Sequence, residues 1–371
     1  MNGEGKDGED IIKSGEAIRV MVSPLFFMAL LTQNDKEMRW FDDMDYMHPK
    51  PTGEVTESMS NLLRRGAKEY RCGEYLHALD PISYTKILEE LESERLERKA
   101  KEVTDLVSHR RMNWNKVMLM QLLRSLSDRL NKMNYIELGF MINDTTLEHE
   151  RESLFNLETL LIYPSGLLDK LPNDDYVESV RQNGERLYRR YNLELMSPIR
   201  WSAVSPSIHP LLRLSQVAHL YHRNELLFNT IINCRNRVDV LNLFKDIYSS
   251  EEWCRYFNLK QTSVGVIKSD LVAINLVVTM LYSYGYYFNN DEMISSAIAL
   301  LESLPAESNG YINNWRKKGL LPHNAFDTQA LIQLSDEYCL RGRCNHCPVA
   351  RHICSESSIL GQLPHFFDTK V

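Results

Sequence analysis

The sequence predicts a mainly α protein, an irregular multi-helix bundle with a C-terminal Cys-rich metal loop. Apolar residues recur at helical spacing along most of the chain after Pro81, whereas strand-like alternation is scarce outside residues 18–22. In 371 residues, 43% hydrophobic and 25% charged side chains are typical of a globular protein with a sizeable core. Four cysteines fall within positions 339–354, a density that indicates a metal site.

Residues 1–60 differ from the remainder in charge. They hold twelve acidic and six basic residues, a net charge of -6, whereas the whole chain has a net charge of -7. We expect an acidic, partly disordered segment here, and we interpret Asp42, Asp43, Asp45 and His48 as solvated loop residues. Two helical subdomains are predicted to follow, at residues 61–200 and 201–371, with the cysteine cluster in the second.

The helical pattern starts at Pro81, a residue that suits the first turn of a helix. Ile87, Leu88 and Leu91 begin its apolar side, and we interpret the charged run 92–101 as a solvated helix face. Proline and glycine residues mark the ends of the helices that follow. These helices are expected at residues 114–130, 148–162, 174–191, 210–222, 269–288, 292–303 and 324–338.

Two apolar stretches resemble membrane spans only superficially. Residues 20–31 are too short to cross a bilayer, and residues 271–288 contain Asn275 and Gly285, so we predict a buried central helix there. The first ten residues carry four acids and one lysine, whereas a secretion signal starts with basic residues. We therefore expect a cytoplasmic protein without a membrane partner.

The cysteine cluster has the pattern C-x4-C-x2-C-x6-C, with Cys339, Cys344, Cys347 and Cys354 as the predicted ligands. Four thiolates suit a tetrahedral zinc ion or an iron-sulfur cluster, and the spacing leaves both open. The alternative is a set of reduced surface thiols without metal. Cys72, Cys234 and Cys254 are scattered, and we interpret them as buried or half-buried free thiols.

Basic residues surround this motif. Residues 311–354 contain six lysines or arginines and three acids, a net charge of +3 within a chain of net charge -7. The overall charge excludes a uniformly basic protein, but a local basic patch is typical of nucleic-acid binding. The predicted nucleic-acid-binding residues are Arg316, Lys317, Lys318, Arg341, Arg343 and Arg351.

No other motif in the sequence indicates a catalytic or ligand-binding site. The sequence contains neither a Gly-x-Ser-x-Gly motif nor a phosphate-binding glycine loop. We interpret His219 and His222 as surface or partly buried histidines, because metal-binding helices usually add an acid at a set spacing. Trp201 is interpreted as a core anchor. The sequence identifies no catalytic residue and no small-molecule substrate.

Several stretches resemble an uncharacterised bacterial family, the domain of unknown function 2851, which is common in Bacteroidetes. The longest stretch is 324–339, followed by Cys344 and Cys347, and the whole set covers roughly residues 70–352. Longer members carry an N-terminal region that looks like a restriction-endonuclease core, and residues 1–60 are too short for it. The resemblance therefore implies no nuclease chemistry here. The remaining stretches are 94–99, 166–168, 191–193, 212–216, 274–275 with 284–285, and 304–309 with Trp315.

Residues 327–354 also resemble the iron-sulfur loop that closes helix-hairpin-helix DNA glycosylases. Those enzymes use C-x6-C-x2-C-x5-C, so the first and last spacers differ, and Ala306, Glu307 and Ser308 stand where a hairpin has glycines. No catalytic residue is carried over. Three functions stay open: a nucleic-acid-binding protein with a metal clamp, a protein-interaction scaffold with structural zinc, and a component of a DNA-repair or nuclease enzyme.

Overall fold

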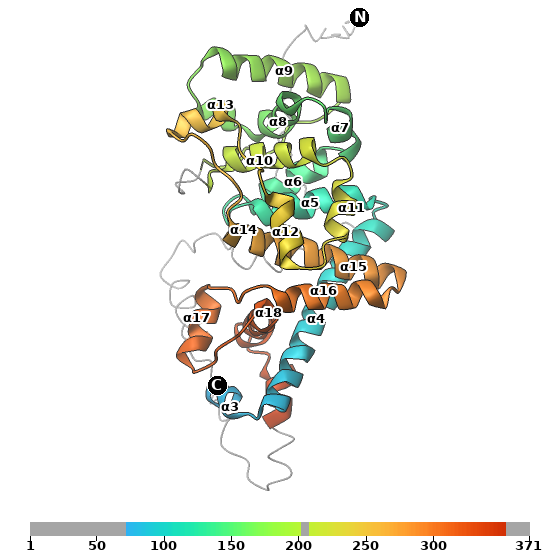
Figure 1. Cartoon of the computed structure of the whole chain (residues 1–371), viewed down its shortest axis with the longest axis vertical. Coiled ribbons are helices and arrows are strands. Elements are labelled where there is room, and N and C mark those ends of the chain that lie inside the picture. Colours follow the sequence, from blue (N-terminus) through green and yellow to red (C-terminus); the bar gives the residue numbers. More distant parts are fainter. Residues whose placement is uncertain (1–71, 202–207, 354–371) are drawn as a thin grey trace, which may run out of the picture.

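The computed structural model describes residues 72–201 and 208–353, except for the side chain of Asn345. The predictions for residues 1–60, for the apolar stretch 20–31 and for Cys354 lie outside the described residues. In the described ranges the chain is helical, with no strand and two isolated β-bridges, Tyr248 to Ser263 and Pro305 to Asn324. The mainly α prediction is confirmed (Figure 1).

Helix α4 (Pro81–Ser108) begins where the sequence predicts a helix. The carboxylate of Asp80 accepts hydrogen bonds from the main-chain N–H groups of Ile82 and Ser83, both at 3.0 Å, and proline occupies the first turn. In Figure 1, α4 runs from the short helix α3 (Gly73–Ala78), at the lower end of the molecule, to the level of α15. It therefore extends from the lower part of the described structure into the upper part.

The helices of the upper part of Figure 1 pack around one large hydrophobic cluster. Short 3-10 helices connect some of them, at Tyr163–Ser165, Leu167–Lys170 and Arg255–Phe257. The α helices are α5 (Trp114–Leu126), α6 (Lys132–Met141), α7 (Asp144–His149), α8 (Leu154–Ile162), α9 (Asp175–Tyr191), α10 (Pro210–Arg223), α11 (Leu227–Ile232), α12 (Arg237–Phe244) and α13 (Glu251–Cys254).

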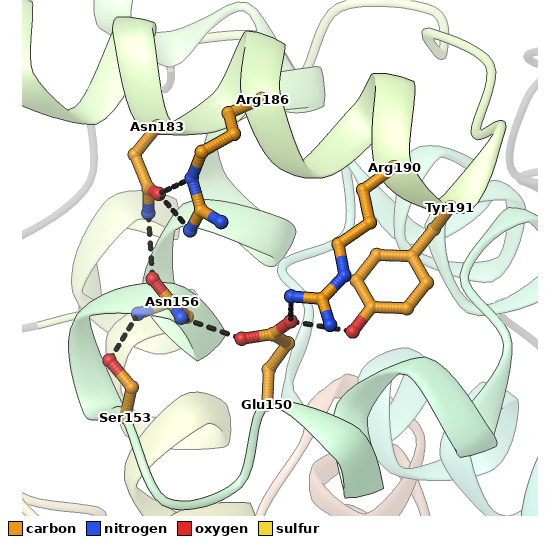
Figure 2. A network of polar contacts seen from close by, with 7 residues as sticks. All are labelled: Glu150, Ser153, Asn156, Asn183, Arg186, Arg190 and Tyr191. Atoms are coloured by element: carbon orange, nitrogen blue, oxygen red, sulfur yellow. Dashed lines mark hydrogen bonds and ion pairs between the residues drawn. The ribbon is translucent and has the colours of Figure 1, made fainter.

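The helix predicted at residues 148–162 is confirmed only from Leu154 onward, as α8, because the chain turns between α7 and α8. Ser153 caps α8, and its hydroxyl accepts a hydrogen bond from the main-chain N–H of Asn156 at 3.3 Å. Glu150, 7% exposed, accepts hydrogen bonds from Asn156 at 2.6 Å, Arg190 at 3.1 Å and Tyr191 at 2.5 Å (Figure 2). This network holds the turn against α9, and the cost of burying the carboxylate is offset by three donors.

The predicted central helix is present as Val266–Phe288. It consists of α14 (Val266–Val272), a π-helical segment (Ala273–Val278) and α15 (Thr279–Phe288). Among the described residues it is the one helix long and apolar enough to cross a membrane, yet 72% of its most apolar window is buried inside the structure. It packs against α4, α5 and α16 (Asp291–Ser303), so it is a core helix.

A second, smaller hydrophobic cluster joins the first described residues to the last. Leu88 and Leu91 of α4 belong to it, whereas Leu96 and Ala100 of the same helix belong to the large cluster. α4 therefore passes from one cluster to the other between Leu91 and Leu96. The predicted domain boundaries stay a prediction. The C-terminal elements of the smaller cluster are α17 (Gly310–Lys317), α18 (Ala325–Gln333), a π-helical segment (Leu334–Cys339) and a 3-10 turn (Cys344–His346).

Candidate metal centre and charged pocket

Four cysteines from two distant parts of the chain interact at the edge of the smaller cluster. Cys72 precedes α3, and its thiol interacts with the thiol of Cys339, at the end of the second π-helical segment. The thiol of Cys339 also interacts electrostatically with Cys344 and Cys347. The contact with Cys339 lowers the pKa of Cys72, whereas the same contact and burial raise the pKa of Cys339. The structure thus brings Cys72 into interaction with two of the four predicted ligands, Cys339 and Cys347.

The backbone between Cys339 and Cys347 forms a tight loop. The main-chain N–H of Arg343 donates to the carbonyl of Tyr338 at 2.9 Å, and Gly342 has a φ of +64°, which favours glycine. The N–H of Cys347 donates to the carbonyl of Cys344 at 3.1 Å, so both cysteines belong to one turn. Cys347 is 5% exposed, and burial raises its pKa to about 11, whereas Cys344 is exposed.

As they stand, the described residues contain no group of three or more His, Cys, Asp or Glu side chains placed to hold a metal ion. The six cysteines of the described ranges are free thiols. Of the predicted ligand set, Cys354 lies outside the described residues. Cys72 was not predicted as a ligand, because no local pattern connects a single cysteine to a motif that begins at position 339.

The predicted nucleic-acid-binding residues lie around the same loop, but acidic residues neutralise half of them. Arg351 pairs with Glu90 of α4, and Arg341 and Arg343 lie 3.4 and 3.6 Å from the carboxylate of Glu337. The other three are on or just after α17. There, Arg316 donates to the carbonyl of Glu307 at 3.5 Å, Lys317 is exposed, and the aliphatic stem of Lys318 packs against Gly73.

A charged cavity of about 210 Å³ lies where the two hydrophobic clusters meet. Arginine and lysine side chains of α4, an asparagine of the first π-helical segment and two glutamines of α18 supply most of its polar lining. Three of the stretches on which the predicted family resemblance rests, 94–99, 274–275 and 304–309, contribute to it. The lining residues are Arg95, Arg98, Lys99, Glu102, Arg124, Lys132, Asn275, Glu307, Gln329, Ile332, Gln333 and Asp336.

The prediction that residues 92–101 form a solvated face is wrong for its first turn. Glu92 is 0% exposed and Arg95 is 3% exposed, because α15 and α18 pack against α4 at this level. Arg95 Nη1 donates to Glu92 Oε1 at 2.8 Å, while Arg95 Nη2 and Glu92 Oε2 are buried without a hydrogen-bond partner among the described residues. Burial raises the pKa of Glu92 to about 7, although Arg95, Lys99 and Arg98 oppose this shift.

Arg98 links this pair to α18. Its Nη2 donates to Gln333 Oε1 at 3.1 Å and its Nη1 donates to Glu102 at 3.2 Å, while its Nε is buried without a partner in the described structure. On the opposite side, Gln329 donates to Glu307, and burial raises the pKa of Glu307. The cavity therefore combines paired carboxylates with unpaired guanidinium N–H groups.

One sequence signal could have found this pocket. Leu88, Glu92, Arg95 and Lys99 follow one another at spacings of four, three and four residues, so they lie on one stripe of the helix. The charged residues thus continue an apolar stripe, which indicates that they enter the interior. The alternating charges of the run favoured the wrong interpretation.

A second, more open hollow of about 490 Å³ shares Arg98 and Gln333 with the charged cavity. It extends to Arg343 and His346 of the cysteine loop. Tyr338 Oη, on its wall, donates to Glu94 at 2.6 Å. The charged pocket and the cysteine loop are therefore neighbours on one side of α4.

The two histidines of α10 are partly buried, as predicted. His219 Nδ1 lies 2.8 Å from the carbonyl oxygen of Tyr248, and His222 Nδ1 lies 2.7 Å from that of Arg151. Each ring is thus bound to a different carbonyl. The prediction for Trp201 as a core anchor is wrong, because its side chain is 40% exposed.

A model of one protein family, described as "Protein of unknown function (DUF2851)", matches residues 44–310. The match covers more than half of the chain and ends before the cysteine loop. No curated protein and no solved structure matches the chain.

Proposed function

The chain belongs to the family described as Protein of unknown function (DUF2851), and from its site we propose a cytoplasmic, nucleic-acid-binding helical protein that is clamped by a cysteine-ligated metal centre. The ligands in this proposal are Cys72, Cys339, Cys344 and Cys347. The observation that carries it is the contact between Cys72 and Cys339, which come from opposite ends of the described chain. The metal is zinc or iron in an iron-sulfur cluster.

The chemistry of the donors supports this centre. Four thiolates are soft ligands that prefer zinc or iron-sulfur clusters to hard cations. Cys344 and Cys347 approach from one turn, a geometry in which both sulfurs can face one ion. Binding requires the exposed Cys344 to move toward the other thiols, and Gly342 gives the loop the freedom to do so. Free thiols also suit the reducing cytoplasm.

The centre acts as a clamp in this account. The smaller hydrophobic cluster is assembled from Leu76, Ile87, Leu88 and Leu91 on one side and residues from Ile312 to Val349 on the other. The packing of α4 against α18 and the hydrogen bond between Tyr75 Oη and His352 Nδ1, at 2.6 Å, already join the two groups. A metal centre would add a direct link from Cys72 to the cysteine loop. Because metal binds the folded arrangement far better than the unfolded chain, its binding free energy adds to the stability of this cluster.

Metal analysis tests the clamp. Anaerobically purified full-length protein is measured for zinc, iron and sulfide and for its visible spectrum, together with the variants Cys72→Ser and Cys354→Ser. Cys234→Ser is the matched control, since Cys234 is a buried thiol in the large cluster. We expect one centre per chain in the wild type, retention in Cys234→Ser and Cys354→Ser, and loss in Cys72→Ser. Full metal content in Cys72→Ser, or none in the wild type, contradicts the proposal.

The nucleic-acid surface of the proposal is the set Arg316, Lys317, Lys318, Arg341, Arg343 and Arg351. It is supported by the local excess of positive charge near the loop and by the loop's resemblance to that of helix-hairpin-helix DNA glycosylases. Since Glu337 and Glu90 neutralise three of these residues, binding should be modest and strongly salt-dependent. The proposal includes no reaction.

Retention on a DNA column and titration with a fluorescent oligonucleotide test this surface. Combined reversal of Arg341 and Arg343 to glutamate should abolish binding, whereas Arg189→Glu, at an 83% exposed position on α9, should leave it intact. Equal binding by all three proteins rules out the surface. If the wild type retains its metal but does not bind DNA at low salt, the nucleic-acid part of the proposal is wrong. The protein is then better described as an interaction scaffold.

A further inference from the structure

We infer that the charged cavity between α4, α18 and the first π-helical segment is a binding site for the phosphoryl group of a small molecule. The inference is independent of the metal centre and of the nucleic-acid surface, because no residue proposed for either lines this cavity.

The buried guanidinium groups are the first support. The side chain of Arg95 is 4% exposed, and its Nη2 has no hydrogen-bond partner among the described residues. Arg98, from the next turn of α4, also lines the cavity, and its Nε is buried without a partner among the described residues. Burying an N–H group without a partner costs free energy, and an oxyanion in the cavity would remove that cost. Planar guanidinium donors match the geometry of phosphoryl oxygens.

The charge of the lining is the second support. Five basic side chains and three acidic ones line the cavity, a formal excess of +2 in a chain of net charge -7. Two of the three acids are engaged, since Glu102 pairs with Arg98 and Glu307 accepts from Gln329. The buried atoms of lining residues that have no partner among the described residues, Arg95 Nη2 and Arg98 Nε, are donors, which favours an anion over a cation.

The backbone of the central helix is the third support. Asn275 lies in the π-helical segment, and its Oδ1 accepts a hydrogen bond from Lys99 Nζ at 3.3 Å. Its Nδ2 donates to the carbonyl of Leu271 at 3.0 Å. π-Helical turns within α helices occur frequently at functional sites, because they turn a side chain out of the regular helical register. Here the turn lies beside the amines and guanidinium groups of α4.

The size of the cavity favours a small ligand. A volume of about 210 Å³ accommodates a phosphoryl group with a short substituent. The phosphoryl group can come from a free small molecule or from the terminal phosphate of an oligonucleotide. The test must therefore separate these two sources.

Calorimetric titration of the full-length, metal-loaded protein is the direct test, at constant ionic strength. The probes are inorganic phosphate, glycerol phosphate and a short oligonucleotide with or without a 5′-phosphate. We expect phosphate and glycerol phosphate to bind, and Arg98→Gln to weaken both by about tenfold or more, because a charged donor is lost. Arg189→Gln, on the distant helix α9, should bind like the wild type.

Controls keep the result interpretable. The side chain of Arg98 is 28% exposed, so its substitution disturbs the fold less than substitution of the buried Arg95. The double variant Arg95→Gln with Glu92→Gln removes both charges of the buried pair and leaves no lone charge in the interior. Metal content and DNA retention should be unchanged in Arg98→Gln, which separates this inference from the proposed function. It is overturned if neither phosphate compound binds, if both bind all variants equally, or if only oligonucleotides bind irrespective of the 5′-phosphate.

Discussion

Removing the buried charge of Glu92 should flatten the pH dependence of stability. Glu92 is 0% exposed, and burial raises its pKa from 4.5 to about 7 against the opposing charges of Arg95 and Lys99 on α4. Tyr282, from α15, also interacts with it. The perturbation is Glu92→Gln, which keeps the shape and an acceptor for Arg95 but cannot ionise.

The expected loss of stability follows from this shift in the pKa of Glu92. Because the folded pKa lies above the unfolded one, the folded state binds more protons between pH 4.5 and pH 7, and stability is lost as the pH rises through this window. A shift of this size corresponds to about 3 kcal/mol once the carboxyl is fully ionised, and most of it develops between pH 5 and pH 8. Glu158, whose pKa burial also raises to about 7, contributes equally to both proteins and cancels in the comparison.

Urea unfolding at pH 5 and at pH 8 measures the effect. Relative to Glu92→Gln, the wild type should lose about 2 to 3 kcal/mol of unfolding free energy between these values. Glu97→Gln, at an exposed position on the same helix, should follow the wild type. Parallel pH profiles for the wild type and Glu92→Gln would refute the assignment of a raised pKa to this carboxyl.

Three further substitutions test the packing by the same unfolding assay. Trp315→Leu should lower the free energy of unfolding by about 3 kcal/mol, because a 0% exposed indole is lost together with its hydrogen bonds to α18 and to the segment that follows α18. A change below about 1 kcal/mol would contradict the central place of Trp315 in the smaller cluster. Lys116→Met should lower the free energy of unfolding by about 2 kcal/mol, since the ammonium group of Lys116 donates to two carbonyls at the end of α6, at 2.6 and 2.5 Å. Unchanged stability would show that water can replace the ammonium group. Gly184→Ala should destabilise by about 1 to 3 kcal/mol, because the new methyl would lie 2.3 Å from the ring of Tyr163, whereas Gly310→Ala meets open space and should be nearly neutral; equal effects of the two would contradict the close approach.

Most helices were predictable from local signals. Asp174 caps α9 (Asp175–Tyr191), with hydrogen bonds from the main-chain N–H groups of Tyr176 and Val177, and Pro210 begins α10, so the sequence carries both starts directly. The short helices α3, α6, α7, α11, α12, α13 and α17 were missed. They provide only one to three turns, too few for a periodic pattern to stand out, and tertiary packing supplies much of their stability.

The candidate sites were harder to predict because both depend on tertiary contacts. The spacing of Cys339, Cys344 and Cys347 was visible in the sequence, but the approach of Cys72 results from the fold of α3 against the last described residues. The burial of Arg95 likewise depends on α15 and α18 covering α4. The identities of the charged residues were clear, whereas their neighbours were not.

X-ray absorption at the edge of the bound metal tests the cysteine clamp most directly. Full-length protein, purified without oxygen, should show four sulfur neighbours at about 2.3 Å, from protein thiolates in a zinc site and from thiolates and sulfide in an iron-sulfur cluster. In Cys72→Ser the bound metal should be lost. A first shell of nitrogen and oxygen in the wild type, or a spectrum that Cys72→Ser leaves unchanged, would contradict a centre that joins Cys72 to the loop.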